Sequence, residues 1–296
     1  MKYMYQKIIT DDYEYLKWET DNPKALLVIN HGMAETPYRY DNFAQFLNEN
    51  GYEVYAIFAK GHEEGKQLGH LDKGDYNLSI ENTHKLINIL RSRYDNKVIL
   101  FGHSMGSFMA NRYAQLYGYT LDGLVLSGSS YPGLLEKIGA VLVNLIYALS
   151  LHKNKNSKFC KKLTFGSYNK HIKNPKTEFD WLSKDANEVK KYIDSPLSGF
   201  DCTIGFYKEF IPNMAKLNRF LNDIPKTLPI LLVSGSEDPV SNNGEKIRTL
   251  LVNLKDKQKI ERVEIKLFDD MRHEILNEVD KSLVYQEILD FLNSIQ

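Results

Sequence analysis

A serine in the G-x-S-x-G motif at residues 102–106 has the surroundings of a nucleophile. It follows the apolar run 98–101, which is typical of a buried strand, and it opens the segment 104–117, whose pattern predicts a helix. A serine at such a sharp turn is exposed above the sheet, and the glycines on either side let neighbouring chains approach. The helix N-terminus also favours developing negative charge. The motif and its position therefore predict a nucleophilic Ser104 rather than an ordinary helix start.

A serine hydroxyl becomes reactive when a base takes its proton and a third group orients that base. Asp238 follows the apolar run 230–233, and His273 follows the run 263–268, so each lies just past an expected strand. Ligands of open parallel sheets gather at the edge where the strands end. The chain order Ser, Asp, His is the one expected of α/β-hydrolases. We therefore expect Ser104, Asp238 and His273 to form a catalytic triad.

Two neighbours in the sequence compete for these roles. Glu237 is adjacent to Asp238, but Asp238 precedes a proline that fixes the turn, so Asp238 is favoured. His103 is adjacent to the serine and is expected to point away from it, whereas His273 alone follows a late strand.

Acyl transfer also requires N–H donors for the negative charge that develops on the carbonyl oxygen. The residue after the nucleophile, Met105, supplies one donor. The second is expected from the loop after the strand 25–30, at the N–H of Met33. A plain turn at Gly32 is the alternative interpretation.

The elements that must position these residues alternate between strand and helix signals, which predicts an α/β fold with a parallel sheet covered on both faces. Strands are expected at 25–30, 54–58, 98–101, 124–126, 230–233 and 263–268, and helices at 39–50, 78–93, 104–117 and 245–254. A C-terminal helix is expected to place Leu283, Val284, Ile288 and Leu292 on one face.

This alternation is lost between residues 131 and 215. The segment 134–151 has the pattern of an apolar helix, and the segment 151–176 holds eight lysines and no acidic residue. We therefore expect a core formed by residues 1–130 and 216–296, with 131–215 inserted as a cap, or lid, over the serine.

Composition narrows the class of protein. The 38 lysines and arginines balance the 38 aspartates and glutamates, so no net positive field favours nucleic acid. The two cysteines make neither a disulfide scaffold nor a metal-ligand spacing. The longest nearly apolar run, of 14 residues, is shorter than the ~20 that a membrane-spanning helix needs. A soluble, cytoplasmic, globular protein that uses no metal or organic cofactor is expected.

Several stretches together resemble the monoacylglycerol lipase and lysophospholipase branch of the α/β-hydrolases, which are serine aminopeptidase S33-type hydrolases. They are HGMAE at 31–35 with Arg39, GH at 61–62, GHSMG at 102–106, SEDP at 236–239 and RHEILN at 272–277. The resemblance implies the α/β-hydrolase fold, with a mostly parallel central sheet, flanking helices and a helical cap. It also implies the same triad and an oxyanion hole at Met33 and Met105.

In monoacylglycerol lipases the Glu and Arg of the first motif help to form the glycerol end of the site, which implies a substrate-binding role for Glu35 and Arg39. From the residue types alone, Glu35 and Arg39 fit equally well the interpretation that they form the charged first turn of a helix. The chain departs from the family at Ala59-Lys-Gly-His-Glu63, where an Asp and an Arg usually precede Gly-His-Gly.

These observations predict the hydrolysis of carboxylic esters through an acyl-enzyme on Ser104. The resemblance implies monoacylglycerols or lysophospholipids as substrates. The apolar helix and the lysines of the cap suggest transient contact with an anionic membrane surface, with a cap packed on the core and a solvated loop as the alternative. A short-chain carboxylesterase, a proline iminopeptidase-like peptidase and a non-catalytic receptor on the hydrolase fold are the competing functions. The peptidase would need a cap carboxylate, for which Glu178, Asp180, Asp185, Glu188 and Asp194 are candidates.

Overall fold

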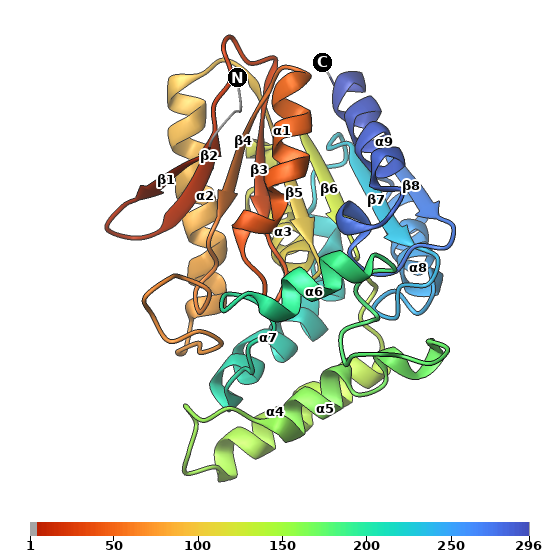
Figure 1. Ribbon diagram of the computed structural model, residues 1–296. Coiled ribbons are helices and arrows are strands. Elements are labelled where there is room, and N and C mark those ends of the chain that lie inside the picture. The colour runs from red at the N-terminus through yellow and green to blue at the C-terminus, as the bar shows by residue number, and fades with distance from the viewer. Residues whose placement is uncertain (1–4, 296) are drawn as a thin grey trace.

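The computed structural model describes residues 5–295 and contains one eight-stranded sheet (Figure 1). In spatial order its strands are β1 (Gln6–Ile9), β2 (Glu14–Trp18), β4 (Tyr52–Ile57), β3 (Ala25–Asn30), β5 (Lys97–His103), β6 (Gly123–Ser127), β7 (Ile230–Gly235) and β8 (Val263–Phe268). Within this range β2 runs antiparallel to β1 and β4, and the five other neighbouring pairs are parallel. The mostly parallel sheet expected from the sequence is confirmed.

Helices cover both faces of this sheet, as predicted (Figure 1). On one face lie α1 (Asp41–Glu49) and α9 (Lys281–Ser294), and on the other lie α2 (Asp75–Arg93), α3 (Met105–Tyr117) and α8 (Glu245–Val252). The strand β3 shows why both faces need cover. Its residues Leu26 and Val28 pack with the second group of helices, and Leu27 and Ile29 pack with the first. Side chains of a strand alternate between faces, so an unbroken apolar strand requires two layers of helices.

Two details differ from the sequence prediction. The hairpin of β1 and β2 was not predicted, because its segments QKII and EYLKW mix charged and apolar residues and lie at the edge of the sheet. Leu283 was expected on the buried face of α9, but it is 61% exposed, whereas Val284, Ile288 and Leu292 are buried. One residue corresponds to about 100° around a helix, so Leu283 and Val284 cannot face the core equally.

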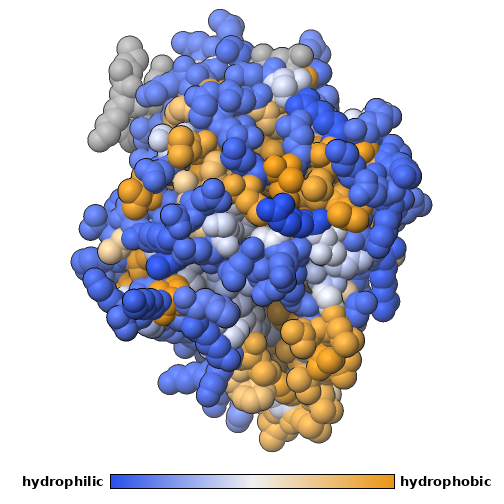
Figure 2. Space-filling model, turned by 90° about the vertical axis from the view of Figure 1, so that its right-hand side faces the viewer, coloured by the Kyte–Doolittle hydropathy of each residue, from blue (hydrophilic) through white to orange (hydrophobic). Residues whose placement is uncertain are grey.

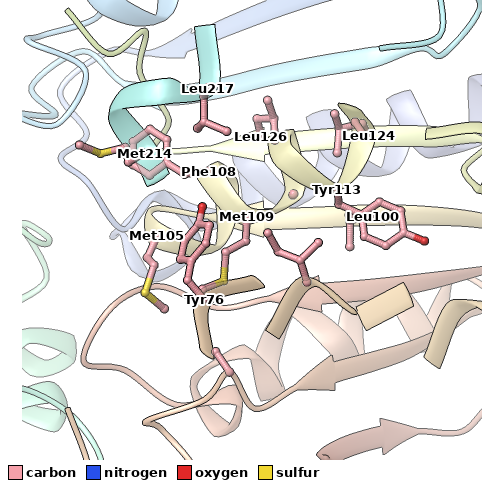
Figure 3. Packing of buried hydrophobic residues seen from close by; sticks show 14 of the residues in the cluster. Tyr76, Leu100, Met105, Phe108, Met109, Tyr113, Leu124, Leu126, Met214 and Leu217 are labelled. Carbon is pink, nitrogen blue, oxygen red and sulfur yellow. The ribbon is translucent and has the colours of Figure 1, made fainter. Parts of the chain in front are cut away.

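The chain between β6 and β7 forms α4 (Leu134–Leu149), α5 (Lys158–Phe165), α6 (Ala186–Asp194) and α7 (Ile204–Lys216), which lie beyond the carboxyl ends of the parallel strands (Figure 1). We call residues 131–215 the cap; its boundaries stay a prediction. Met214 of α7 joins the same apolar cluster as Phe108 of α3 and Leu126 of β6 (Figure 3). The cap is therefore packed onto the core through α7. None of the helices in residues 5–295 is long and apolar enough to cross a membrane.

Candidate active site

Ser104 occupies the turn between β5 and α3 in a strained backbone conformation. Its φ is +52°, a region that non-glycine residues seldom adopt and that clusters at functional sites. Its N–H donates to the carbonyl of Ser127 on β6 (2.9 Å). A Cβ at Gly106 would lie 2.0 Å from the Asn30 carbonyl oxygen, and one at Gly102 would lie 2.4 Å from the Gly106 oxygen. The glycines of the motif are therefore required for the close approach of neighbouring chains.

His273 and Asp238 meet beyond the ends of β8 and β7. Nδ1 of His273 lies 2.9 Å from Oδ1 of Asp238. The fully buried carboxylate also accepts hydrogen bonds from the Val240 N–H (2.8 Å) and the Ser234 hydroxyl (2.9 Å). Burial alone would raise the pKa of Asp238, but the charge of His273 and these hydrogen bonds hold that pKa below its ordinary value. Asp238 is thus an ionised group that fixes the histidine ring.

The other nitrogen of His273 is free to act. Its Nε2 is buried and has no hydrogen-bond partner within residues 5–295. Burial lowers the pKa of His273, yet Asp238, with smaller contributions from Glu274 and Glu35, raises it above 6.5 in balance. Ser104 and His273 line the same cavity, although no hydrogen bond joins them. Catalytic hydrogen bonds are often long before substrate binds.

The expected oxyanion donors lie at the start of α3 and in the loop after β3. Within the described part of the chain, neither the Met33 N–H nor the Met105 N–H has an acceptor. The Met33 loop is close to the nucleophile, since a Cβ at Gly32 would lie 3.2 Å from the Cβ of Ser104. Both donors are therefore available near Ser104, and their role stays a prediction.

Two buried histidines hold the loop that carries Met33. Nε2 of His31 accepts the Ala59 N–H (3.1 Å), and Nε2 of His62 accepts the Ala34 N–H (3.0 Å). Burial lowers the pKa of His31 to about 3 and that of His62 to about 4. Both rings are neutral near neutral pH, as an accepting Nε2 requires.

Glu35 and Arg39 lie in a buried charged network instead of the first turn of α1, which begins at Asp41. Glu35 accepts hydrogen bonds from the Gly32 N–H and from the Tyr40 hydroxyl (2.7 Å), and it lines the cavity with Ser104. Arg39 pairs with Glu274 and lies 3.7 Å from Glu35. Arg39 is not among the residues that line this cavity. Its visible role is to hold the two carboxylates.

Sequence reasoning missed several residues at this site. His103 was expected only to point away from the serine, but it lines the cavity and its ring lies 4.8 Å from that of His273. The ring of Trp181 in the cap lies 5.1 Å from the His273 ring, and the Trp181 carbonyl accepts a hydrogen bond from the backbone N–H of His273 (3.4 Å).

Arg272 donates from its side chain to the carbonyls of Asp180 (2.7 Å) and Ser183 (3.1 Å). These contacts thus bind the cap to the loop at residues 269–274, which carries His273. RHEILN at 272–277 was singled out in the sequence as a family motif, but this contact with the cap was not predicted from it.

The cavity above Ser104 has a volume of about 570 Å³ and lies between the core and the cap. The core contributes polar groups, among them Ser104, His273 and Glu35. The cap contributes mainly aromatic side chains, which are Phe165, Phe179, Trp181, Tyr192, Phe200 and Tyr207. It also contributes three lysines of α5, which are Lys158, Lys161 and Lys162. A chamber of this kind suits an amphiphile with a reactive polar group at one end.

Known proteins share both the sequence pattern and the fold. Residues 21–280 match the family described as serine aminopeptidase, S33. A monoacylglycerol lipase from Mycolicibacterium smegmatis is 26% identical over 295 residues, covering 95% of this chain and 92% of its own. The human monoglyceride lipase is 26% identical over 246 residues, covering 78% and 72%. The crystal structure of a thermostable carboxyl esterase from Bacillus coagulans in complex with glycerol superimposes with a TM-score of 0.88 at 27% identity, covering 100% and 99%.

These similarities extend over nearly the whole chain, and the matching structures share its mostly parallel sheet with flanking helices. The family predicted from the motifs is confirmed: this chain belongs to the serine aminopeptidase S33-type family of α/β-hydrolases.

Proposed function

We propose that the protein hydrolyses monoacylglycerols or lysophospholipids through an acyl-enzyme on Ser104. The broader class is a carboxylic ester hydrolase, as its family and lipase relatives indicate. The observation that carries the proposal is the buried pair of Asp238 and His273. The Nε2 of this histidine has no hydrogen-bond partner in the described part of the chain, and His273 lines the same cavity as Ser104.

In the proposed reaction, Nε2 of His273 takes the Ser104 proton while Oγ attacks the ester carbonyl carbon. The N–H groups of Met33 and Met105 stabilise the negative oxygen, and Asp238 stabilises the imidazolium. His273 then protonates the leaving alcohol. Water, deprotonated by the same histidine, next attacks the acyl-enzyme and releases the carboxylic acid. Glu35, which borders the cavity beside Gly32, is positioned to accept a hydrogen bond from a glycerol hydroxyl.

A substrate profile tests this function. We expect kcat/KM for p-nitrophenyl esters to rise from the acetate to medium or long acyl chains, because the aromatic walls bury apolar chain surface. Monoacylglycerols or lysophospholipids with matched chains should then be cleaved. Maximal activity on the acetate would favour the short-chain carboxylesterase, and aminoacyl amides as the preferred substrates would favour the peptidase. No turnover and no labelling by a fluorophosphonate would favour the receptor.

We also propose that the cap contacts anionic lipid surfaces. An apolar patch stands out on the surface at the position of α4 (Figure 2), and its members include Leu135 (76% exposed), Val141 (68%) and Leu149 (75%). Patches of this kind mark interaction sites on soluble proteins. The adjoining segment 151–176 adds eight lysines without an acidic residue, which suits anionic headgroups. A cytoplasmic location stays a prediction.

Vesicle flotation tests this contact. We expect the protein to float with phosphatidylglycerol-containing vesicles at low salt, and to bind less in high salt because headgroup attraction is screened. The variant Leu135→Ser/Val141→Ser should lose this binding. Leu283→Ser, which changes a leucine of α9 that is 61% exposed and lies outside the cap, is the control and should bind normally. Equal binding by the cap variant and the wild type would contradict the proposal.

A further inference from the structure

Three lysines of one short helix line the cavity that holds Ser104. Lys158 lies three residues before Lys161 and four before Lys162 on α5, so it shares a side of that helix with each of them, and all three line the cavity. Lys161 is neutralised by Glu178 (3.1 Å) and Asp201 (2.9 Å). Within residues 5–295, Lys158 and Lys162 have no acidic partner. The cap wall of the cavity therefore presents two lysines without an acidic partner. Because Glu178 and Asp201 together carry one negative charge more than Lys161 neutralises, the net charge of this wall is +1.

The core side of the cavity has the opposite balance. Glu35 and Glu274 share the single cation Arg39, and Asp238 faces a histidine that is neutral when it acts as base. The wall beside Ser104 thus repels an anion, while the wall formed by α5 attracts one. A field of this form orients a charged ester with its anionic group toward α5 and its ester carbonyl toward Ser104.

We propose that Lys158 and Lys162 form a binding site for the phosphate group of a phosphomonoester-bearing lysolipid, which makes such an anionic ester the preferred substrate. A phosphomonoester carries a charge of about −1.5 to −2 near neutral pH, which matches two free ammonium groups. A neutral glycerol head gains nothing from them, and a choline head brings a cation beside them. This inference rests on the proposed ester hydrolysis and names its substrate class.

Two matched esters test the site: 1-octanoylglycerol 3-phosphate and 1-octanoylglycerol, both kept below the concentrations at which they aggregate. The wild type should show the higher kcat/KM on the phosphate ester. Lys158→Gln/Lys162→Gln should lower that value by about tenfold or more through KM, because two charge-assisted contacts are lost. Its activity on the neutral ester should stay within twofold. The control Lys173→Gln/Lys176→Gln removes the same charge from lysines outside the cavity and should change neither value.

Calorimetric titration with octyl phosphate and with octanol repeats the comparison without catalysis. We expect octyl phosphate to bind the wild type more tightly than it binds the double variant, and octanol to bind both equally. A loss of the same size on both esters, or in the control variant, would overturn the inference, as would inorganic phosphate binding as tightly as octyl phosphate. If neither ester is cleaved but octyl phosphate binding still depends on the two lysines, the proposed reaction fails and the anion site stands.

Discussion

Ser104→Ala should lower kcat for ester hydrolysis by about 10⁴-fold or more, the scale on which serine hydrolases depend on their nucleophile. The variant loses the oxygen that forms the acyl-enzyme, while its cavity and oxyanion donors remain. Within residues 5–295 the Ser104 hydroxyl makes no hydrogen bond, so its removal leaves no buried partner unsatisfied. The backbone strain at φ +52° is present with either residue. The midpoint of thermal unfolding should therefore change little.

Steady-state kinetics, fluorophosphonate labelling and thermal unfolding together check this result. Ser129→Ala is the control, because within residues 5–295 the hydroxyl of the buried Ser129 likewise has no hydrogen-bond partner, and Ser129 does not line the cavity. Labelling should disappear only in Ser104→Ala. If that variant keeps its esterase activity, the mechanism proposed for this site is wrong.

The edge strand β8 alternates apolar and charged residues, but the five parallel strands between it and β2 are built on apolar runs bounded by glycines and polar loops, so the sequence predicts the core of this fold well. Runs of this kind are typical of strands buried on both faces, so they predict a parallel sheet between two layers of helices. The hairpin of β1 and β2 was missed, because edge strands are exposed and carry charges such as those of Lys7 and Lys17. Their pairing depends on contact with β4, which no local pattern encodes.

The candidate site likewise has residues that the sequence predicts and residues that it does not. Ser104, Asp238 and His273 follow strand ends, so the topology of the sheet is enough to bring them to one edge. The contacts of His103 and Trp181 with the His273 ring could not be predicted, because they depend on where the loop 269–274 places that ring and, for Trp181, on how the cap packs against this loop. The pairing of Arg39 with Glu274 could not be predicted either. Glu274 is 235 residues away along the chain, and only the folded structure shows that the two side chains form a buried ion pair.

Asp238→Asn should lower kcat/KM by about 10⁴-fold while leaving the cavity in place. The carboxylate accepts a hydrogen bond from Nδ1–H of His273, which leaves the lone pair of Nε2 to take the serine proton. A neutral amide no longer imposes that tautomer and does not stabilise the imidazolium. Glu237→Gln is the matched control, since Glu237 is nearly half exposed and pairs with Lys184 (2.9 Å). It should keep nearly full activity. The opposite outcome would make Glu237 the acid of the triad.

The pH profile separates this electrostatic role from a merely structural one. The base must be neutral, so kcat/KM of the wild type should fall as the pH drops through the pKa of His273, which lies above 6.5. Burial lowers that pKa, and Asp238 is the main group that raises it, with help from Glu274 and Glu35. Removing the charge of Asp238 lets burial dominate, so the acidic limb of the variant should move to lower pH. The fold loss in activity should therefore be smaller at acid pH than at pH 8. An unshifted limb would mean that His273 is not the titrating base. The neighbouring His103, whose pKa burial lowers to about 3, stays neutral throughout and adds no limb of its own.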